Sequence, residues 1–256
     1  SDVYKRQSFK GTFTYAHNKV LEYDEPDFQK YPNISRVGHS VDQQLLYIAE
    51  RLFIDDSEVQ RNPKQNLGGW VSGGDIKYKN LPDVNGNYDN VIDSNDRQYT
   101  GMPTTPEIVY GFGPSLRYKK FDFSFFFQGA ARVSIMMNGI HPFGADGTRN
   151  VLQFIADDYW SDTNQDIYAG YPRLSKRDNE NNTKASTYWQ RNGAFLKLKN
   201  LEVGFNHKFF RVYLRGSNLL TFSPFKYWDP EMGSGSGLSY PTQRVFNVGV
   251  QFSINK

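Results

Sequence analysis

The last segment of the chain alternates strictly between apolar and polar residues. Phe246, Val248, Val250, Phe252 and Ile254 share one parity, and Asn247, Gly249, Gln251, Ser253 and Asn255 share the other. Because successive side chains of a β-strand point to opposite faces, this pattern predicts a strand with one apolar and one polar face. Such a strand occurs in a soluble sandwich, with its apolar face buried, and in a membrane barrel, with its apolar face toward lipid.

The same alternation predicts a small set of strands joined by connections of two very different lengths. We expect strands at residues 8–16, 108–118, 121–129, 195–206, 211–222 and 244–255. Tight turns are expected at residues 119–120 and 207–208, and residues 17–107, 135–194 and 223–243 are long connections. Outer-membrane barrels alternate short periplasmic turns with long outer loops in this way. Since the smallest such barrels have about eight strands, the pattern predicts part of a larger barrel.

Helical periodicity is confined to short stretches of the long connections. Residues 42–51 and 55–61 have amphipathic spacing, and residues 154–160 have the length of one or two helical turns. The fold class that follows is all-β, namely part of a large antiparallel transmembrane β-barrel with long extracellular loops.

Composition narrows the class of protein further. The net charge of +3, without any run of lysines and arginines, does not indicate a nucleic-acid partner. The mean hydropathy of −0.67 is incompatible with a helical membrane protein. Aromatic residues make up 16% of the chain, an excess expected where strands cross a bilayer and long loops stay in water. The absence of cysteine excludes disulfides and thiolate metal sites.

Several motifs, in order from about residue 37 to the end of the chain, establish a family resemblance. They are residues 74–80 (GDIKYKN), 83–86 (DVNG), 91–97 (VIDSNDR), 171–174 (YPRL), 195–205 (FLKLKNLEVGF), 211–214 (RVYL), 216–222 (GSNLLTF) and 228–231 (WDPE). Together with the closing strand, they make the protein resemble the SusC/RagA-type TonB-dependent outer-membrane receptors of Bacteroidetes. Because several long motifs match in the same order, the resemblance is specific.

The resemblance implies a role in nutrient uptake and no enzymatic activity. Receptors of this type are barrels of about 22 strands that import oligosaccharides or peptides across the bacterial outer membrane. They work beneath a SusD-like surface lipoprotein and are powered through the TonB complex. Against the family pattern, we expect residues 8–256 to be the C-terminal part of the barrel, without the plug domain or the TonB-contacting segment. Residues 1–7 are expected to be a non-native start.

The richest polar cluster of the sequence lies in residues 83–96. Its candidate calcium ligands are Asp83, Asn85, Asn87, Asp89 and Asp93. Calcium prefers several oxygen ligands at alternate positions of a tightly turning loop, which is the spacing of the first four. The match to an EF-hand loop is incomplete, because Tyr88 replaces the turn glycine and Ser94 replaces the bidentate glutamate. The alternative is a turn-rich loop in which Asn and Asp side chains bind the backbone.

Aromatic side chains in the long connections are the candidate substrate contacts. They are Trp160, Tyr188, Trp189, Tyr227 and Trp228. Ligand sites combine apolar walls with a few placed polar groups, and aromatic rings can stack on the C–H faces of sugars. The alternative is that these rings form the interfacial girdle of a barrel or pack the loops against each other or against the lipoprotein.

Two other classes of protein compete with the receptor. The main alternative is a soluble secreted β-sandwich that serves as a carbohydrate-binding module, with the apolar strand faces turned inward as a core. A glycan-degrading enzyme has little support, since no Gly-x-Ser-x-Gly motif occurs and the four histidines are scattered along the sequence.

Overall fold

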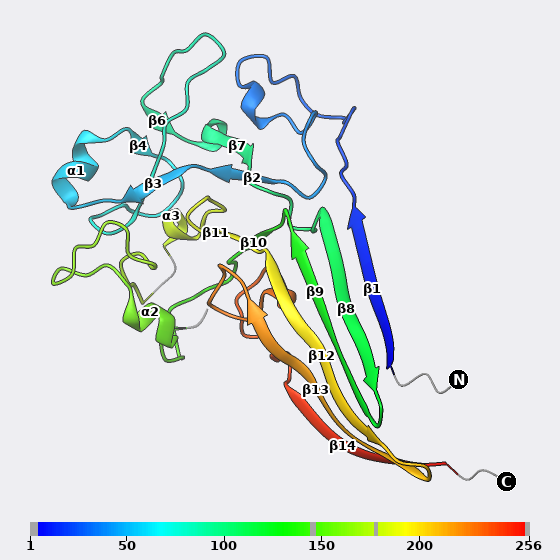
Figure 1. Ribbon diagram of the computed structural model, residues 1–256. Helices are drawn as coiled ribbons and strands as arrows, with labels where there is room; N and C mark the ends of the chain where they lie inside the picture. The colour runs from blue at the N-terminus through cyan, green and yellow to red at the C-terminus, as the bar shows by residue number, and fades with distance from the viewer. Residues whose placement is uncertain (1–4, 144–146, 177–178, 254–256) are drawn as a thin grey trace.

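The computed structural model describes residues 5–143, 147–176 and 179–253. Its largest element is an antiparallel sheet of six strands, in the order β1-β8-β9-β12-β13-β14 (Figure 1). The strands are β1 (Lys5–Tyr15), β8 (Ile108–Tyr118), β9 (Phe121–Ala131), β12 (Phe195–Asn206), β13 (Phe210–Phe222) and β14 (Val245–Phe252). All six strands predicted from the sequence are therefore confirmed. The predicted strand residues Ile254 and Asn255 lie outside the described residues.

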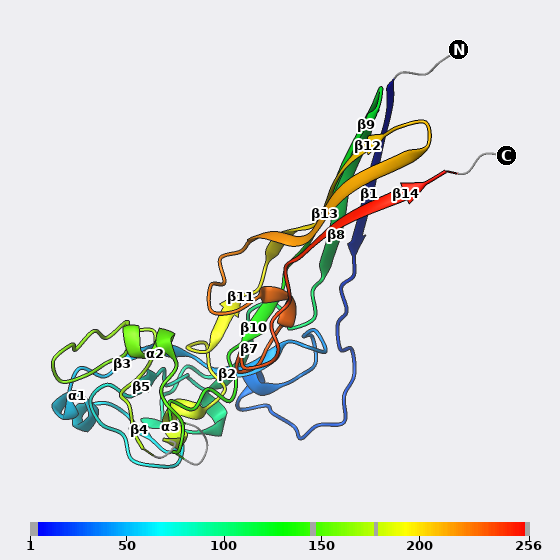
Figure 2. The same ribbon diagram turned by 90° about the horizontal axis from the view of Figure 1, so that it is seen from below.

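The connections also follow the predicted alternation. Residues 119–120 join β8 to β9, and residues 207–209 join β12 to β13, as tight turns at one end of the sheet. The long connections all leave from the other end and fold together into one region, the loop domain, formed by residues 16–107, 132–194 and 223–244. Figures 1 and 2 show that the start of β1 and the end of β14 both lie at the end of the sheet far from the loop domain.

One face of the sheet is apolar and uncovered. A row of paired residues crosses five strands through Val248, Leu214, Val203, Phe123 and Leu116, with exposed fractions of 76%, 53%, 45%, 36% and 38%. A sandwich would bury these side chains under a second sheet. Among the described residues, no other strand packs on this face. The exposed apolar face therefore favours the barrel prediction over the sandwich alternative.

The opposite face is polar and contains an ion-paired cluster near the tight turns. The guanidinium of Arg211 lies 2.6 Å from Asp122 and 2.5 Å from Glu202, on three neighbouring strands. Nearby, the ring of Tyr213 lies so close to Gly249 that any added Cβ would clash with it. Glycine is needed there because a cross-strand aromatic ring covers the backbone.

A bulge changes the parity of the apolar residues in β12. Leu201 pairs with Phe125 on the apolar face, whereas Leu198 pairs with Phe127, so that Lys199 is an extra residue between two regular segments. On β13 the bulge continues at Asn218, whose φ of 54° is a left-handed conformation that asparagine tolerates. The bulge turns Lys197 to the polar face of the sheet, beside Gln128.

The loop domain has its own small strands and helices. The strands are β2 (Gln44–Tyr47), β3 (Ala49–Leu52), β4 (Lys64–Gln65), β5 (Ile76–Tyr78), β6 (Val91–Ile92), β7 (Arg97–Thr100), β10 (Ser134–Met136) and β11 (Gln190–Asn192). The helices are α1 (Asp56–Arg61), α2 (Gln153–Asp157) and α3 (Glu180–Thr183), with 3-10 turns at Pro32–Ile34, Ser94–Asp96 and Pro230–Met232. No helix in the described part of the protein is both long and apolar enough to span a membrane.

The helices predicted from the sequence are only partly correct. The helix predicted at residues 55–61 is confirmed, and Asp55 caps it by accepting a hydrogen bond from the Glu58 amide. The short helix expected at residues 154–160 is present as α2. The helix expected at residues 42–51 is wrong, because this stretch forms β2 and β3, which pair with β7 and β5. Pairing partners remote in sequence override the local amphipathic spacing.

The loops pack around a continuous apolar core. The first two long connections supply most of it, and the last connection adds Phe225. The residues from the first two include Leu46, Leu52, Ile76, Ile92, Ile135, Ile155, Trp160 and Trp189. A core assembled in this way fixes the relative positions of segments that are far apart in the sequence.

The helix α1 is attached to this core by an ion-paired carboxylate, which leads to a prediction. Glu58 accepts two bonds from Arg51, at 2.5 and 2.9 Å, and one from Lys77 at 3.0 Å. The bonds from Arg51 are the main reason that the pKa of Glu58 falls from 4.5 to about 2. A carboxylate with a depressed pKa stabilises the fold above its unfolded pKa, and this contribution disappears as the pH falls toward 2.

We therefore expect Glu58→Gln to reduce the free energy of unfolding of the loop domain by about 1–2 kcal/mol at pH 7, after allowance for solvent screening. The difference from the native protein should shrink as the pH falls from 4.5 toward 2. Denaturant unfolding at pH 7 and pH 3, followed by tryptophan fluorescence, measures the stability difference between the native protein and the variant and its dependence on pH. An equal difference at both pH values would contradict the role of the ionised Glu58 carboxylate in stability.

Candidate ligand-binding site

The five aromatic candidates occupy different environments in the loop domain. Trp160 and Trp189 are only 4% and 6% exposed and belong to its core. Trp228 is half-buried, donates its indole N–H to the Gly233 carbonyl and packs on Phe225. These three rings hold the loops together, as the packing alternative predicts.

The other two candidates, Tyr188 and Tyr227, line one cleft. The cleft has a volume of about 330 Å³. Its charged and aromatic lining residues are Glu50, Arg51, Asp158, Tyr168, Tyr188, Arg191 and Tyr227. The Tyr168 ring is 75% exposed and the Tyr227 ring 36% exposed, so both present ring surface to solvent. The cleft therefore combines exposed ring faces with carboxylate and guanidinium groups. A ligand that has both apolar faces and polar groups can contact both kinds of side chain.

Local contacts fix the rings of this cleft in place. The Tyr188 hydroxyl donates to the Ala169 carbonyl at 2.7 Å, and burial raises the pKa of this hydroxyl. Arg191 donates to the Tyr188 carbonyl at 2.5 Å, and its guanidinium lies 5.9 Å from the centre of the Tyr227 ring. Tyr188 comes from the connection before β12 and Tyr227 from the connection after β13, so the cleft exists only in the folded loop domain.

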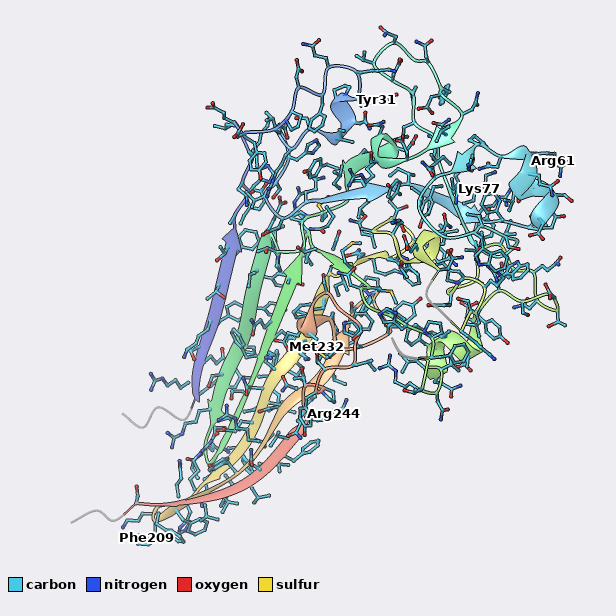
Figure 3. All side chains as sticks on the ribbon, turned by 180° about the vertical axis from the view of Figure 1, so that it is seen from behind. Tyr31, Arg61, Lys77, Phe209, Met232 and Arg244 are labelled. Atoms are coloured by element: carbon cyan, nitrogen blue, oxygen red, sulfur yellow. The ribbon has the colours of Figure 1, made fainter. Side chains whose placement is uncertain are left out.

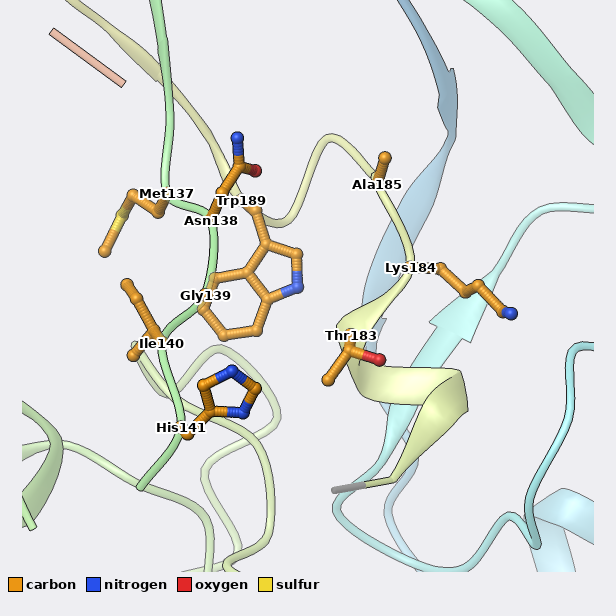
Figure 4. Close-up of a pocket in the computed structure, with 9 residues that line it drawn as sticks. All are labelled: Met137, Asn138, Gly139, Ile140, His141, Thr183, Lys184, Ala185 and Trp189. Carbon is orange, nitrogen blue, oxygen red and sulfur yellow. The ribbon is translucent and has the colours of Figure 1, made fainter. Parts of the chain in front are cut away.

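A second, smaller pocket lies on the edge of the Trp189 ring (Figure 4). Its volume is about 140 Å³, and it is lined by residues 137–141 on one side and 183–185 on the other. The indole N–H of Trp189 donates to the Asn182 carbonyl at 2.7 Å, so the ring is held by packing and by one hydrogen bond. The volume of this pocket is suited to a single small group rather than to an oligomer.

A buried polar network explains two of the sequence motifs and positions the loops around the cleft. Asp75 is fully buried and accepts hydrogen bonds from Arg173 and Asn182, each at 2.9 Å. Gly74, with a φ of 80°, lies directly against the Trp160 ring, where an added Cβ would clash with the ring carbons. The Gly-Asp motif and the Tyr-Pro-Arg-Leu motif therefore meet at one point of the core.

The residues proposed for calcium lie in turns of the loop at residues 83–96. One Asp83 oxygen accepts the backbone amides of Asn85 and Asn87, both at 2.9 Å. Asp89 and Asp93 accept the amides of the residues two positions later, as in Asx-turns. Among the described residues, no three acidic or histidine side chains are arranged to hold a metal ion.

Sequence reasoning missed most of the polar lining of the cleft. Glu50, Arg51 and Arg191 come from segments without a recognisable motif, and Asp158 is one of many carboxylates in the long connections. Their positions depend on the pairing of β3 with β5 and of β10 with β11, which local patterns do not reveal. The sequence of residues 44–51 (QLLYIAER) has no alternation of apolar and polar residues that could have pointed to this region.

Comparisons with known proteins agree with this architecture. No family model matches the sequence. The protein is 30% identical over 267 positions to TonB-dependent receptor P3 of Formosa agariphila, and 29% identical over 269 positions to TonB-dependent receptor P26 of the same organism. These alignments cover 93% and 91% of this protein and 26% of each relative.

Solved structures of the RagAB peptide importer share the fold. In its open-open state the TM-score is 0.64, with 17% identity over 99% of this protein and 27% of the matched importer subunit. A second structure of the RagAB peptide transporter gives a TM-score of 0.66 and 16% identity over 98% of this protein. The six-stranded sheet and its loop domain thus share the fold of a section of these solved structures.

The curated relatives are TonB-dependent receptors and the structural relatives are RagAB importers, so these similarities support the SusC/RagA-type resemblance that the motifs indicate. The protein spans about a quarter of the length of the curated relatives that it matches.

Proposed function

We propose that this protein forms a section of the membrane-spanning barrel, with its outer loops, in a TonB-dependent importer of the bacterial outer membrane. The importer takes up oligosaccharides, with peptides as the alternative substrate class. It works with a SusD-like surface lipoprotein and receives energy through the TonB complex. The section described here supplies part of the outward-facing apolar band and part of the substrate-binding loops.

The uncovered apolar face of the six-stranded sheet is the observation that supports this proposal most directly. Large side chains such as Phe246 and Phe252 are 65% and 76% exposed, which is unfavourable in water and favourable against lipid. The sheet is open at β1 and β14, whose outer edges are free to pair with further strands of a barrel. The RagAB structures are those of a peptide importer, and a two-component assembly of that kind supports the lipoprotein partner proposed here.

The cleft of Tyr168, Tyr188 and Tyr227 is the substrate contact that we assign to this protein. The exposed ring faces stack on the C–H groups of a sugar or of a peptide, and Glu50, Asp158 and Arg191 bind the polar groups of the substrate. The cleft lies in the loop domain, on the side of the sheet that the proposal places outside the membrane.

The substrate assignment is tested by binding and uptake. We expect Tyr227→Ala to weaken substrate binding about tenfold, or about 1.4 kcal/mol, because a partly exposed aromatic anchor is removed. Calorimetry on the receptor with its lipoprotein, using candidate oligosaccharides and peptides, measures the affinity, and growth on the bound substrate measures uptake. Tyr88→Ala, which changes an exposed ring in the loop at residues 83–96, is the matched control. Unchanged affinity in Tyr227→Ala would remove this cleft from the proposal.

Calcium in the loop at residues 83–96 is a separate proposal. The alternate spacing of Asp83, Asn85, Asn87 and Asp89 supports it, and the backbone bonds that the aspartates already accept oppose it. Calorimetric titration of calcium into the receptor decides the question. A saturable heat that disappears in Asp83→Asn would support an ion, and no heat would leave these residues with a turn-forming role.

A further inference from the structure

The end of the sheet opposite the loop domain has an unusual charge pattern. We define the turn tip as the two tight turns with their flanking residues, 117–121 and 205–209. Its exposed basic residues are Arg117, Lys119, Lys120 and Lys208. The acidic side chains of the ion-paired cluster near it, Asp122 and Glu202, are both already bonded to Arg211. The described part of the turn tip therefore has an uncompensated positive charge.

Exposed aromatic rings alternate with these lysines. Tyr118, Phe121 and Phe209 are 57%, 59% and 59% exposed, and Phe209 marks the far end of the molecule in Figure 3. The amino groups of Lys119 and Lys208 lie 5.3 Å and 5.4 Å from the centres of the Tyr118 and Phe209 rings. Aromatic rings prefer the boundary between lipid and water, and lysines there extend their amino groups to the polar side.

The two turns form one continuous surface. The amide of Asn206 donates to the Lys120 carbonyl at 2.6 Å, and the rings of Phe121 and Phe205 are 5.3 Å apart. A pocket of about 510 Å³ is lined by Tyr118, Lys119, Lys120 and Phe121. The basic groups and the apolar rings of this surface are therefore close enough to contact one ligand that has both an anionic and an apolar part.

The backbone of the first turn gives an independent indication. Lys119 has a φ of 52°, in the left-handed region where hairpin turns strongly favour glycine or asparagine. A lysine in this conformation is strained relative to glycine. A charged residue held in a strained turn conformation is a candidate for a contact made by its charge.

We propose that the turn tip binds the headgroups of anionic phospholipids in the membrane leaflet that it reaches. The lysines contact the phosphate, and Tyr118, Phe121 and Phe209 insert at the boundary of the acyl chains. This inference rests on the proposed function, because it requires the sheet to span a bilayer. Each lysine near an anionic surface contributes about 1 kcal/mol, or about fivefold in affinity.

The test uses the full receptor that contains this section, purified in detergent, with phosphatidylglycerol and phosphatidylcholine as probes. Native mass spectrometry measures how much of each lipid stays bound. We expect the native receptor to retain phosphatidylglycerol in preference to phosphatidylcholine, and excess inorganic phosphate not to displace it. In the triple variant Lys119→Asn, Lys120→Gln and Lys208→Gln the preference should fall by about 100-fold, at about fivefold for each lysine.

Two controls make the result specific. Lys119→Asn alone suits the turn better than lysine, so its expected fivefold loss of preference is not a consequence of unfolding. The variant Lys19→Gln, Lys64→Gln and Lys226→Gln removes three exposed lysines of the loop domain and should keep the native preference.

The outcomes separate this inference from the proposed function. Heat-modifiable migration of the receptor on gels reports barrel assembly in either lipid, independently of headgroup preference. An assembled receptor whose triple variant still prefers phosphatidylglycerol, or whose preference is lost to inorganic phosphate, overturns the lipid site alone. A receptor that assembles in neither lipid overturns the proposed function and the lipid site together.

Discussion

Replacing Lys197 with methionine is expected to lower the free energy of unfolding of the loop domain by about 3–5 kcal/mol. Lys197 is 1% exposed, and its amino group is ion-paired with Asp229 and, at 2.7 Å, with Glu231. Burial opposes ionisation of Asp229, yet the bond from Lys197 holds the pKa of that carboxyl below its usual value. Without Lys197, the partly buried carboxylate of Asp229 would lose its compensating charge, and Glu231 would keep only Lys199 as a partner.

The structural consequence of this ion pair is the attachment of the last long connection to the sheet. Asp229 and Glu231 belong to the Trp-Asp-Pro-Glu motif, and Lys197 and Lys199 belong to the motif at residues 195–205. The two motifs therefore meet in space. In Lys197→Met we expect residues 223–244 to become sensitive to limited proteolysis as well.

Lys199→Met is the matched control for this prediction. Lys199 bonds only to Glu231, at 2.7 Å, and its side chain is 22% exposed, so its loss should cost less than about 1 kcal/mol. Denaturant unfolding followed by tryptophan fluorescence measures both variants, because all four tryptophans of the sequence lie in the loop domain. Equal effects of the two substitutions would show that Lys197 has no special role.

Asp75→Ala is expected to have an effect of similar size, about 3–5 kcal/mol, on the same domain. Asp75 is fully buried and bonds to Arg173, Asn182 and the Ser72 amide, which join three separate segments of the loops. Removal of its carboxylate leaves the guanidinium of Arg173 without its charge partner in a largely buried position. The cleft should lose ligand affinity in parallel, because this network positions the loops that form it.

Asp75→Asn separates the charge of this residue from its hydrogen bonds. It preserves one acceptor for Asn182 and removes the ion pair with Arg173, so we expect an intermediate loss of about 1–3 kcal/mol. Asp24→Asn, at an exposed position, should change little. Unfolding curves of the three variants test this order, and an Asp75→Ala variant as stable as Asp24→Asn would contradict it.

The strands of the sheet were predictable because their signal is local. In β9, Phe121, Phe123, Phe125 and Phe127 alternate with Asp122 and Ser124, and period two specifies both the strand and its faces. The bulge at Lys199 is also present in the sequence, as a change of parity between Leu198 and Leu201. That change becomes interpretable only when the partner strands β9 and β13 are known.

The cleft was predictable only in part. Aromatic residues in long loops identify candidates, and two of the five, Tyr188 and Tyr227, line the cleft, whereas Trp160 and Trp189 are in the core. An aromatic side chain buried in the core and one exposed to solvent cannot be told apart from the neighbouring residues in the sequence. Burial depends on what covers the ring, which comes from distant segments of the sequence.

By itself, the sequence determined an all-β fold with an apolar sheet face and long polar loops, and its ordered motifs indicated the resemblance to TonB-dependent receptors. Side-chain alternation and ordered motifs are local properties, so they can be recognised in the sequence without knowing which residues are in contact. The tertiary structure alone decided that the loops form a domain with its own core. Contacts such as that of Asp75 with Arg173, 98 residues apart, depend on the path of the whole polypeptide, and no local pattern encodes them.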